Sequence, residues 1–270
     1  MPSDTVGGLL AELVAGALDD AAARRRELSL AEVERRAAEA PEPRDAHAAL
    51  APGDRVRIIA EVKRASPSRG QLAEIGDPAS LAVSYETGGA SAISVLTEQR
   101  RFSGSLADLA EVRAAVGVPV LRKDFIADPY QVVEARAAGA DIVLLIVAAL
   151  DQRELQELHG LVTELGMTAL VEAHSAEEVE RALEVGASVV GVNARDLTTF
   201  ELDRDLFGSL ADRIPAGVIR VAESAVTTPD DVAHYRAAGA DAVLVGEALV
   251  TGGDPVTTLQ GFLAAGRTLE

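Results

Sequence analysis

The chain has 270 residues and a formal net charge of -18 at pH 7, a length that suits one large α/β domain or two small ones. This acidic balance repels nucleic-acid backbones and anionic membranes, so neither is expected as a partner, although a local basic cluster can still bind a small anionic substrate. Without cysteine, the chain forms no disulfide, thiolate nucleophile or cysteine-ligated metal site.

The first fifty residues read as two helices followed by a proline-rich break. The apolar face of the first helix consists of Leu9, Leu10, Leu13, Val14 and Ala17. Ser29 and Glu32 form a capping box that predicts a second helix to about residue 40. The stretch 7–18 contains Glu12 and lacks a basic leader, so we expect neither a signal peptide nor a membrane span, and a cytoplasmic location. These helices are expected to be either a cover on the fold that follows or a lid over its ligand.

Four segments farther along the chain share one design: a helix end, a Gly-Ala-Asp or Gly-Ala-Ser turn, and an apolar β-run. They are residues 85–96, 134–145, 181–192 and 235–246. Their turn glycines are 47 to 53 residues apart, which is about twice a strand-plus-helix unit of ~25 residues. A further apolar run therefore belongs between each pair, and it is found at 118–123, 167–172 and 217–224. With 57–63 as the first run, the pattern predicts eight βα units.

Eight nearly all-apolar strands alternating with amphipathic helices predict an α/β fold, a parallel (βα)8 TIM barrel with an N-terminal helical extension over residues 1–50. We expect one domain spanning residues 1–270. The competing fold is a doubly wound open sheet. Its G-x-G-x-x-G fingerprint is absent from the sequence, as is the P-loop pattern.

The two lysines are unusual in both number and position. Of the 25 lysine and arginine residues, only Lys63 and Lys123 are lysines, and each ends an apolar run that reads as a buried strand. Arginine stays protonated below pH ~12, whereas lysine, with a pKa near ~10.4, can be tuned to release a proton. A compositional preference for arginine would leave lysines anywhere, and finding both at strand ends by chance is roughly a one-in-a-hundred event. We interpret both as proton-handling residues.

The C-terminal strand ends of such a barrel carry the active site. In chain order they hold Glu61 and Lys63, Thr97 and Phe102, Lys123 and Phe125, Glu172, Asn193 and Arg195, Glu223 and Ser224, and Gly246 and Glu247. Glu61 and Lys63 are two residues apart and therefore share a face. Two lysines, glutamates, an asparagine and an arginine at one mouth predict acid–base chemistry, although a charged barrel rim would account for any of them singly.

The loops after the last two strands are candidates for phosphate binding. Ser224 with Ala225 and Gly246 with Glu247 stand where barrels often bind phosphate through backbone N–H groups. Glu247 suits this role if its side chain points away and only its N–H is used. The four histidines are His47, His159, His174 and His234. None has metal-ligand spacing, and we interpret them as surface or packing residues, so no metal site is predicted.

Several blocks together resemble the indole-3-glycerol-phosphate synthase family. They are IAEVKRASPSRG (59–70), ISVLTEQRRFSGS (93–105), PVLRKDFIADPYQVVEARAAGADIVLLI (119–146), GMTALVEAHS (166–175), GVNARDL (191–197), and VAESAV with GADAVLVGEALV. The resemblance covers residues 5 to 265. It implies a barrel with an N-terminal helical extension, no cofactor and no metal. The implied substrate is a small phosphosugar–anthranilate anion, 1-(2-carboxyphenylamino)-1-deoxyribulose 5-phosphate, and the implied products are indole-3-glycerol phosphate, CO2 and water.

The resemblance also implies roles for individual residues. Lys123 resembles the general acid, Glu172 the group that stabilises positive charge or assists dehydration, and Glu61 and Lys63 the base and acid of the late steps. Asn193 is counted with this catalytic set. The implied substrate contacts are Ser66, Phe102, Phe125 and Arg195, and the implied phosphate site is Ser224, Ala225, Gly246 and Glu247. The loop 64–70 is expected to close over the ligand. The chain is expected to act as a monomer, and weak contact with other tryptophan-pathway enzymes is left open.

Two departures from the family pattern bear on these expectations. Ala225 stands where the family usually has glycine, so its methyl group is expected to crowd the phosphate or to disfavour a positive φ. Arg101 stands where an aromatic residue is common, which affects the predicted aryl pocket. Two other functions remain open. A Schiff-base lyase or aldolase would use a strand-end lysine as nucleophile. An inactive barrel kept for complex formation would not need every charged member of the constellation.

Overall fold

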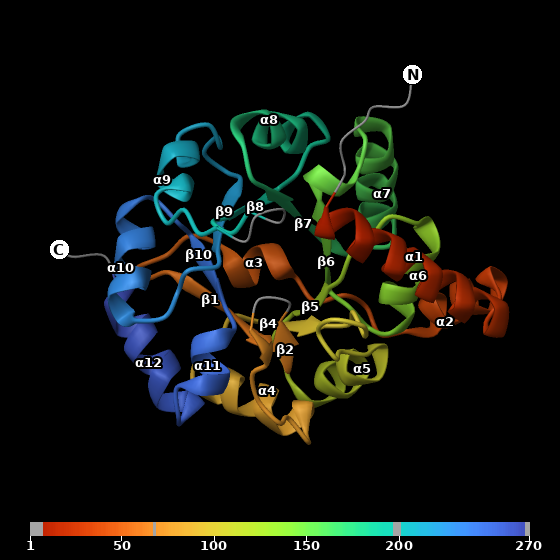
Figure 1. The fold of residues 1–270 in the computed structure, drawn as a ribbon, viewed down its shortest axis with the longest axis horizontal. Coiled ribbons are helices and arrows are strands. Elements are labelled where there is room, and N and C mark those ends of the chain that lie inside the picture. Colours follow the sequence, from red (N-terminus) through yellow and green to blue (C-terminus); the bar gives the residue numbers. More distant parts are fainter. Residues whose placement is uncertain (1–7, 67–68, 197–200, 268–270) are drawn as a thin grey trace.

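The computed structural model describes residues 8–66, 69–196 and 201–267. Its centre is a closed barrel of parallel strands surrounded by helices (Figure 1). The barrel strands are β1 (Arg57–Val62), β4 (Ala92–Leu96), β5 (Val120–Lys123), β6 (Ile142–Ile146), β7 (Thr168–Ala173), β8 (Val189–Asn193), β9 (Ile219–Glu223) and β10 (Ala242–Val245). The barrel closes where β1 pairs with β10 on one side and with β4 on the other. The predicted (βα)8 barrel is confirmed.

Helices connect these strands and extend the chain at its N-terminal side. They are α1 (Leu9–Glu27), α2 (Leu30–Glu39), α3 (Ala46–Leu50), α4 (Pro78–Thr87), α5 (Leu106–Ala115), α6 (Pro129–Ala137), α7 (Gln152–Glu164), α8 (Ala176–Glu184), α9 (Leu206–Ala211), α10 (Pro229–Ala237), α11 (Glu247–Thr251) and α12 (Pro255–Ala265), with a 3-10 turn η1 (Val147–Ala149). A short antiparallel hairpin, β2 (Ala65–Ser66) with β3 (Gly70–Gln71), follows β1 and was not predicted.

The repeated Gly-Ala turns act as expected at four helix-to-strand junctions. Gly89, Gly139, Gly186 and Gly239 have φ values of 99°, 88°, 82° and 94°. An L-residue with a side chain is strained in this left-handed region, so glycine lets the chain turn from the helix directly into the next strand. This explains why the turn recurs at a spacing set by two βα units.

Two of the three N-terminal helices, α1 and α3, lie at opposite ends of the barrel interior, and α2 packs against α6 on the outside. Leu10 and Leu13 of α1 pack with the inward-facing side chains of the strands, and Leu13 lines the cavity at the barrel mouth. Leu50 of α3 belongs to the same interior cluster. The flanks of α3 bind at the strand starts, where the Arg44 backbone N–H donates to Asp141 Oδ1 at 2.7 Å. The extension therefore covers the barrel, and α1 also supplies part of the cavity wall.

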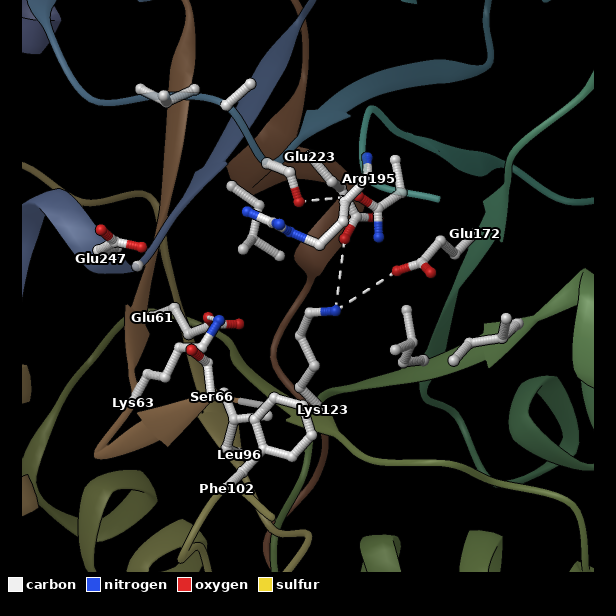
Figure 2. A pocket seen from close by; sticks show the side chains of 18 of the residues that line it. Glu61, Lys63, Ser66, Leu96, Phe102, Lys123, Glu172, Arg195, Glu223 and Glu247 are labelled. Atoms are coloured by element: carbon white, nitrogen blue, oxygen red, sulfur yellow. Dashed lines mark hydrogen bonds and ion pairs between the residues drawn. The ribbon is translucent and has the colours of Figure 1, made fainter. Parts of the chain in front are cut away.

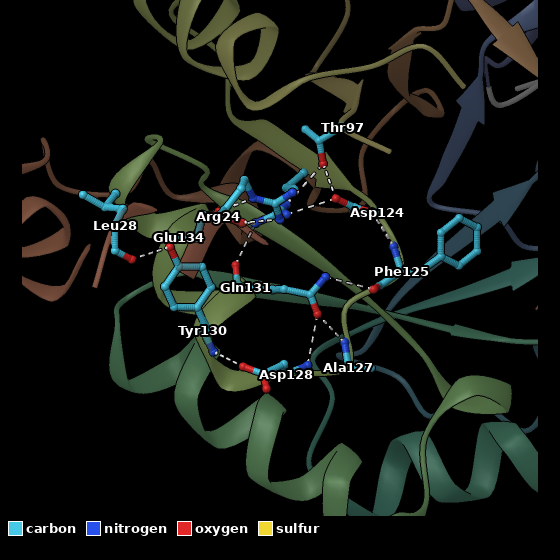
Figure 3. A network of polar contacts seen from close by, with 11 residues as sticks. Arg24, Leu28, Thr97, Asp124, Phe125, Ala127, Asp128, Tyr130, Gln131 and Glu134 are labelled. Atoms are coloured by element: carbon cyan, nitrogen blue, oxygen red, sulfur yellow. Dashed lines mark hydrogen bonds and ion pairs between the residues drawn. The ribbon is translucent and has the colours of Figure 1, made fainter. Parts of the chain in front are cut away.

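A buried polar network joins α1, β5 and α6 (Figure 3). Arg122 on β5 is fully buried and donates to Asp124 Oδ2 and to Glu134 Oε2, each at 3.0 Å. Glu134 on α6 also forms an ion pair with Arg24 of α1, in which Arg24 Nε lies 2.5 Å from Glu134 Oε1. Asp124 in turn accepts the backbone N–H of Phe125 at 2.9 Å. The network thus ties the N-terminal extension to the strand end that carries Lys123.

Replacing Glu134 with alanine is expected to lower the free energy of unfolding by about 3–5 kcal/mol, because it leaves the buried Arg122 guanidinium short of a carboxylate partner. Urea denaturation measures this change. Glu180→Ala serves as the control, since Glu180 is exposed and pairs with exposed Arg213 at 3.1 Å. A pair of that kind contributes about 1 kcal/mol or less. Equal costs for the two variants would contradict the importance of the network.

In the part of the chain that the structure describes, no helix has the length and apolar character needed to cross a membrane.

Candidate active site

A cavity of about 200 Å³ lies at the C-terminal ends of the barrel strands (Figure 2). Every residue of the predicted site lines it: Glu61, Lys63, Ser66, Phe102, Lys123, Phe125, Glu172, Asn193, Arg195, Ser224, Ala225, Gly246 and Glu247. The strand ends and the loops after them supply nearly all of the wall, which explains why residues far apart in sequence meet here. The structure brings these residues together around one cavity, and their roles remain predictions.

Lys123 lies between two buried carboxylates. Its Nζ is 3.4 Å from Glu172 Oε2 and 3.5 Å from Glu223 Oε2, and both glutamates are about 1% exposed. Burial alone would lower the pKa of Lys123, but the negative charges of Glu172, Glu223 and Glu61 outweigh it and raise the pKa above its ordinary value. The lysine is therefore protonated at neutral pH, and its proton is available to a substrate oxygen.

Glu172 and Glu223 respond to this environment in opposite directions. Burial favours the neutral form of each. For Glu172, the charges of Lys123 and His174 outweigh burial and lower the pKa. For Glu223, burial and the negative charge of Glu172 together raise the pKa well above its ordinary value. Of the two carboxyl groups that face Lys123, Glu172 thus favours the ionised form and Glu223 favours the protonated form.

The second lysine is paired within its own strand end. Lys63 Nζ lies 3.3 Å from Glu61 Oε1, as expected for residues two apart on one face. Lys63 Nζ is also 5.7 Å from the centre of the Phe102 ring, within the range of a cation–π contact. This pair lies across the cavity from Glu172 (Figure 2). The mouth therefore contains two separate lysine–carboxylate groups.

Two glycines make room for the buried carboxylates. A Cβ atom on Gly191 of β8 would lie 2.1 Å from Glu223 Oε1. A Cβ atom on Gly246 would lie 2.6 Å from Glu61 Oε1. Any larger residue at either position would displace the acid beside it. Gly246 thus has a role beyond the predicted phosphate contact.

Sequence reasoning omitted Glu223, Asp124, Gly191 and Leu13 from the predicted site. Glu223 was recognised as a residue at a strand end but was not included in the site. Like Glu172, it is a single acid at the end of an apolar strand, and this pattern could have identified it. Asp124 lines the cavity and directly follows Lys123. Gly191 interrupts an otherwise branched apolar run, a pattern that often marks a close approach. No sequence signal placed Leu13 in the cavity, because its contact depends on how α1 docks.

The aryl side of the cavity is apolar. The rings of Phe102 and Phe125 lie 6.2 Å apart in a tilted arrangement. The other apolar lining residues include Leu13, Leu96, Leu144 and Ile146. The Glu98 carboxylate fixes Phe102 by accepting its backbone N–H at 2.9 Å. Arg101 is not among the lining residues, and its half-exposed side chain reaches Glu12 of α1 at 3.7 Å. The departure at Arg101 therefore leaves the aryl wall intact.

The loop after β1 lies beside the predicted phosphate site. Ser66 lines the cavity, whereas Pro67 and Ser68 of the predicted loop 64–70 are outside the described residues. Arg69 Nη1 lies 2.9 Å from Glu247 Oε1. Glu247 also lines the cavity, and its carboxylate is engaged by this arginine. Arg69 offsets the negative charge that would otherwise repel a phosphate.

The loop after β9 is strained at the position where the family pattern departs. Ser224 and Ala225 have φ values of 68° and 57°, a region that L-residues rarely adopt. The Ser224 hydroxyl donates to Asn193 Oδ1 at 2.8 Å, which anchors the turn. The turn then leads through the Thr228 N-cap into α10. Ala225 adopts the positive φ that its methyl group disfavours.

Replacing Ala225 with glycine is expected to lower the KM for a phosphorylated substrate with little change in kcat, because phosphate contacts act equally in the ground and transition states. It should also avoid the usual cost of Ala→Gly, about 0.5–1 kcal/mol, since glycine tolerates this φ. Ala238→Gly is the control, because Ala238 has a φ of -77° and should show the full cost. Steady-state kinetics and urea denaturation measure both effects. An unchanged or raised KM would show that the loop already accommodates the methyl group.

His174 is more than a surface or packing residue. It follows β7, its side chain is 13% exposed, and Nε2 lies 3.4 Å from Glu172 Oε1. His159 is partly buried on α7, and its pKa is lowered by burial. His234 is exposed on α10 and lies 3.5 Å from Asp205. Among the described residues, no group of three or more His, Asp or Glu side chains is arranged to hold a metal ion.

The sequence of this chain is similar to those of proteins of known family. A family model described as indole-3-glycerol phosphate synthase matches residues 10–261. The chain is 71% identical over 262 residues to the protein of that name from Leifsonia xyli subsp. xyli, covering 97% of this chain and 99% of the relative. It is 59% identical over 267 residues to the one from Mycolicibacterium smegmatis, covering 98% and 96%.

Solved structures with low sequence identity support the fold. An N-acetylmannosamine-6-phosphate 2-epimerase from Clostridium perfringens has a TM-score of 0.60 at 15% identity, covering 74% of this chain and 90% of its own. A structure described as native KDPGal has a TM-score of 0.55 at 19% identity, covering 77% and 93%. Likeness at this level of identity extends to the barrel alone.

Proposed function

The chain belongs to the indole-3-glycerol phosphate synthase family, and we propose how its barrel mouth performs the reaction of that family. The enzyme is a carboxy-lyase of tryptophan biosynthesis. It converts 1-(2-carboxyphenylamino)-1-deoxyribulose 5-phosphate into indole-3-glycerol phosphate, CO2 and water. The observation that carries our assignment of roles is the placement of both lysines of the chain at one mouth, each paired with a buried carboxylate.

Lys123 acts as the general acid of ring closure. In this step the ring carbon that bears the carboxylate attacks the ketone carbon, and the ketone oxygen takes a proton. Lys123 is held protonated by Glu172 and Glu223, so the donor is charged before the substrate arrives. General acid catalysis of this kind contributes about 10²–10⁴ in rate.

Glu172 stabilises the cation that ring closure creates. As the aromatic carbon attacks, positive charge develops on the anilino nitrogen, and loss of CO2 then restores the aromatic ring. A carboxylate that stays ionised in a buried site stabilises this charge more strongly than it could in water. The lowered pKa of Glu172, caused by Lys123 and His174 against the effect of burial, supports this role.

Glu61 and Lys63 serve the dehydration. This step needs an acid that protonates the departing hydroxyl and a base that removes a proton from the neighbouring carbon. The ion pair of Lys63 with Glu61 at 3.3 Å holds the two groups side by side at the mouth. Asn193 and Arg195, at the end of β8, orient the substrate beside them.

The two ends of the substrate are separated by the lining of the cavity. The aryl ring packs against Phe102, Phe125 and the apolar residues around them, and Ser66 contacts the substrate from the first loop. The phosphate binds the turn at Ser224 and Ala225 together with Gly246 and Glu247. Holding both ends places the reacting carbons near Lys123, which converts binding energy into orientation.

The direct test is the appearance of indole fluorescence when the purified protein is mixed with the anilino-deoxyribulose phosphate. Steady conversion is expected with no added metal or cofactor. The same assay on the lysine variants described in the Discussion separates the assigned roles. Absence of product with a correctly folded protein would contradict the assignment.

A Schiff-base lyase is the second candidate function, because a strand-end lysine in a barrel can attack a carbonyl. That chemistry needs a neutral amine. Lys123 has a raised pKa because carboxylates surround it, which disfavours the neutral form. Borohydride treatment in the presence of substrate is expected to trap no adduct on Lys63 or Lys123. A trapped adduct, located by mass spectrometry, would favour the Schiff-base class.

We also propose that the enzyme is a single-domain monomer in the cytoplasm. The packing of α1 and α3 against the barrel interior supports one cooperative unit. Light scattering is expected to give the mass of one chain, 28.0 kDa. Contacts with other tryptophan-pathway enzymes are expected to be weak, and a stable complex in the same experiment would overturn that expectation.

A further inference from the structure

The two carboxylates beside Lys123 make nearly the same contact with the lysine, but their other neighbours differ. Glu172 and Glu223 are equally buried and lie 3.4 and 3.5 Å from the same Nζ. The other oxygen of Glu172, Oε1, faces His174 Nε2 at 3.4 Å. Neither oxygen of Glu223 has a hydrogen-bond partner in the described chain. The two acids therefore differ in the groups that contact them on the side away from Lys123.

His174 is held in place from the side opposite Glu172. The Glu178 carboxylate accepts the His174 backbone N–H at 2.7 Å and lies 3.3 Å from Nδ1. Glu178 is itself fixed, because its backbone N–H donates to the Ser175 cap of α8. The buried Nε2 has no hydrogen bond in the part of the chain that the structure describes, and the atom it approaches is Glu172 Oε1. Glu178, His174 and Glu172 thus form a chain from α8 to the barrel mouth.

We propose that His174 is a positioning residue that keeps Glu172 ionised and leaves the shared proton of the carboxylate pair on Glu223. The catalytic consequence of this inference rests on the proposed function. The division of charge between the two carboxylates rests on the geometry of the site and does not depend on that function. When two buried carboxylates share one site, the pKa of one of them is raised, so the proton resides on the carboxylate that has fewer partners. His174 lies beside Glu172, whereas neither oxygen of Glu223 has a hydrogen-bond partner among the residues that the structure describes.

The charges around the pair agree with this division. Burial would lower the pKa of His174, but Glu178, Glu172 and Asp196 raise it, so the imidazolium form is favoured. Lys123 and Glu61 act on the carboxylates from β5 and β1. A proton on Glu223 would also let it donate a hydrogen bond to Glu172, which neither ionised acid could do. Acids with divided pKa values next to each other supply an acid and a base to one reaction.

His174→Gln tests the proposal in the reaction, because glutamine keeps a donor but cannot carry the charge. We expect kcat to fall about tenfold or more, the range seen when an outer partner of a reactive group is lost, with KM changed less than twofold. The acid limb of the kcat/KM profile should move to higher pH, since Glu172 becomes easier to protonate. His234→Gln, which removes an exposed histidine of α10, is the matched control and should leave the profile unchanged.

Glu178→Gln provides a second variant that is milder for folding, because its side-chain oxygen can still accept the His174 N–H. It should shift the acid limb in the same direction by a smaller amount. The double variant should be no worse than His174→Gln alone, because both changes act through one chain. Additive losses, or a loss of kcat without any movement of the pH profile, would contradict a positioning role.

NMR titration of the unliganded protein tests the electrostatic claim without any assay of activity. The His174 ring signals are expected to titrate above the ordinary histidine pKa, and this pKa should fall in Glu172→Gln. With 13C-labelled glutamate, Glu223 should take its proton at a higher pH than Glu172, and His174→Gln should bring the two closer. An ordinary His174 pKa, or a pair unaffected by His174→Gln, would overturn the proposal even if synthase activity is present. If activity is absent and these shifts are found, the proposed function fails and this inference stands.

Discussion

Replacing Lys123 with arginine is expected to lower kcat at least about a hundredfold, within the 10²–10⁴ contribution of general acid catalysis. Arginine keeps the positive charge between Glu172 and Glu223, but its delocalised guanidinium holds its protons more firmly than an ammonium group in the same site. The larger head group also moves the donor atoms in a cavity of about 200 Å³. Folding stability should change little, because the charge that balances the two carboxylates remains. Single-turnover fluorescence and urea denaturation measure the two quantities separately.

Two further variants help to show why kcat falls in Lys123→Arg. Lys63→Arg should also be impaired, with a raised KM if Lys63 holds a substrate anion as well. Arg101→Lys is the control for an arginine–lysine exchange near the mouth, since Arg101 is half exposed and does not line the cavity. Wild-type turnover in Lys123→Arg would mean that the lysine serves only as a charge, and the argument from lysine scarcity would fail with it.

Replacing Glu172 with glutamine should lower kcat by about 10²–10³, because a neutral amide cannot stabilise the cation that develops on the anilino nitrogen. Folding should survive, since Glu223 can then ionise and balance Lys123 at 3.5 Å. Rapid-quench measurement of the ring-closure step checks the rate. The pKa of Glu172 is lowered from its ordinary value, so the wild-type carboxylate is present at neutral pH and is lost only as the pH falls through that lowered value.

Glu177→Gln is the matched control for this change, because Glu177 is an exposed acid in the first turn of α8. It should leave kcat unchanged. If Glu172→Gln kept wild-type turnover, the stabilising role would pass to another group, and Glu223 would be the first to examine.

The barrel itself was predictable because its signals are local and repeated. Gly89, Gly139, Gly186 and Gly239 each end a helix in the left-handed region, and that requirement is visible in one sequence. The apolar runs between them mark where each strand lies, because strands that are buried on both faces are nearly all apolar. Strand ends in a closed parallel barrel all meet at one mouth. For this reason the site could be inferred from strand boundaries alone.

The contacts that decide ionisation were not predictable in this way. Glu223 and Glu172 look alike in sequence, and only packing places His174 behind one of them. The Arg69 contact with Glu247 depends on how the hairpin after β1 folds back over the mouth. Such contacts join residues far apart in the chain through side-chain atoms, and sequence spacing carries no information about them.

The barrel, the family and the set of residues that meet at the mouth could be read from the chain alone. The barrel follows from the backbone requirements of the turn glycines and from the repeated apolar runs, and the family follows from the sequence blocks that resemble it. Packing of the folded chain sets which carboxylate faces which cation, where α1 completes the aryl wall, and the φ of 57° that Ala225 adopts. Those properties depend on burial and on distances of 3 to 4 Å between side chains, which exist only once the chain has packed.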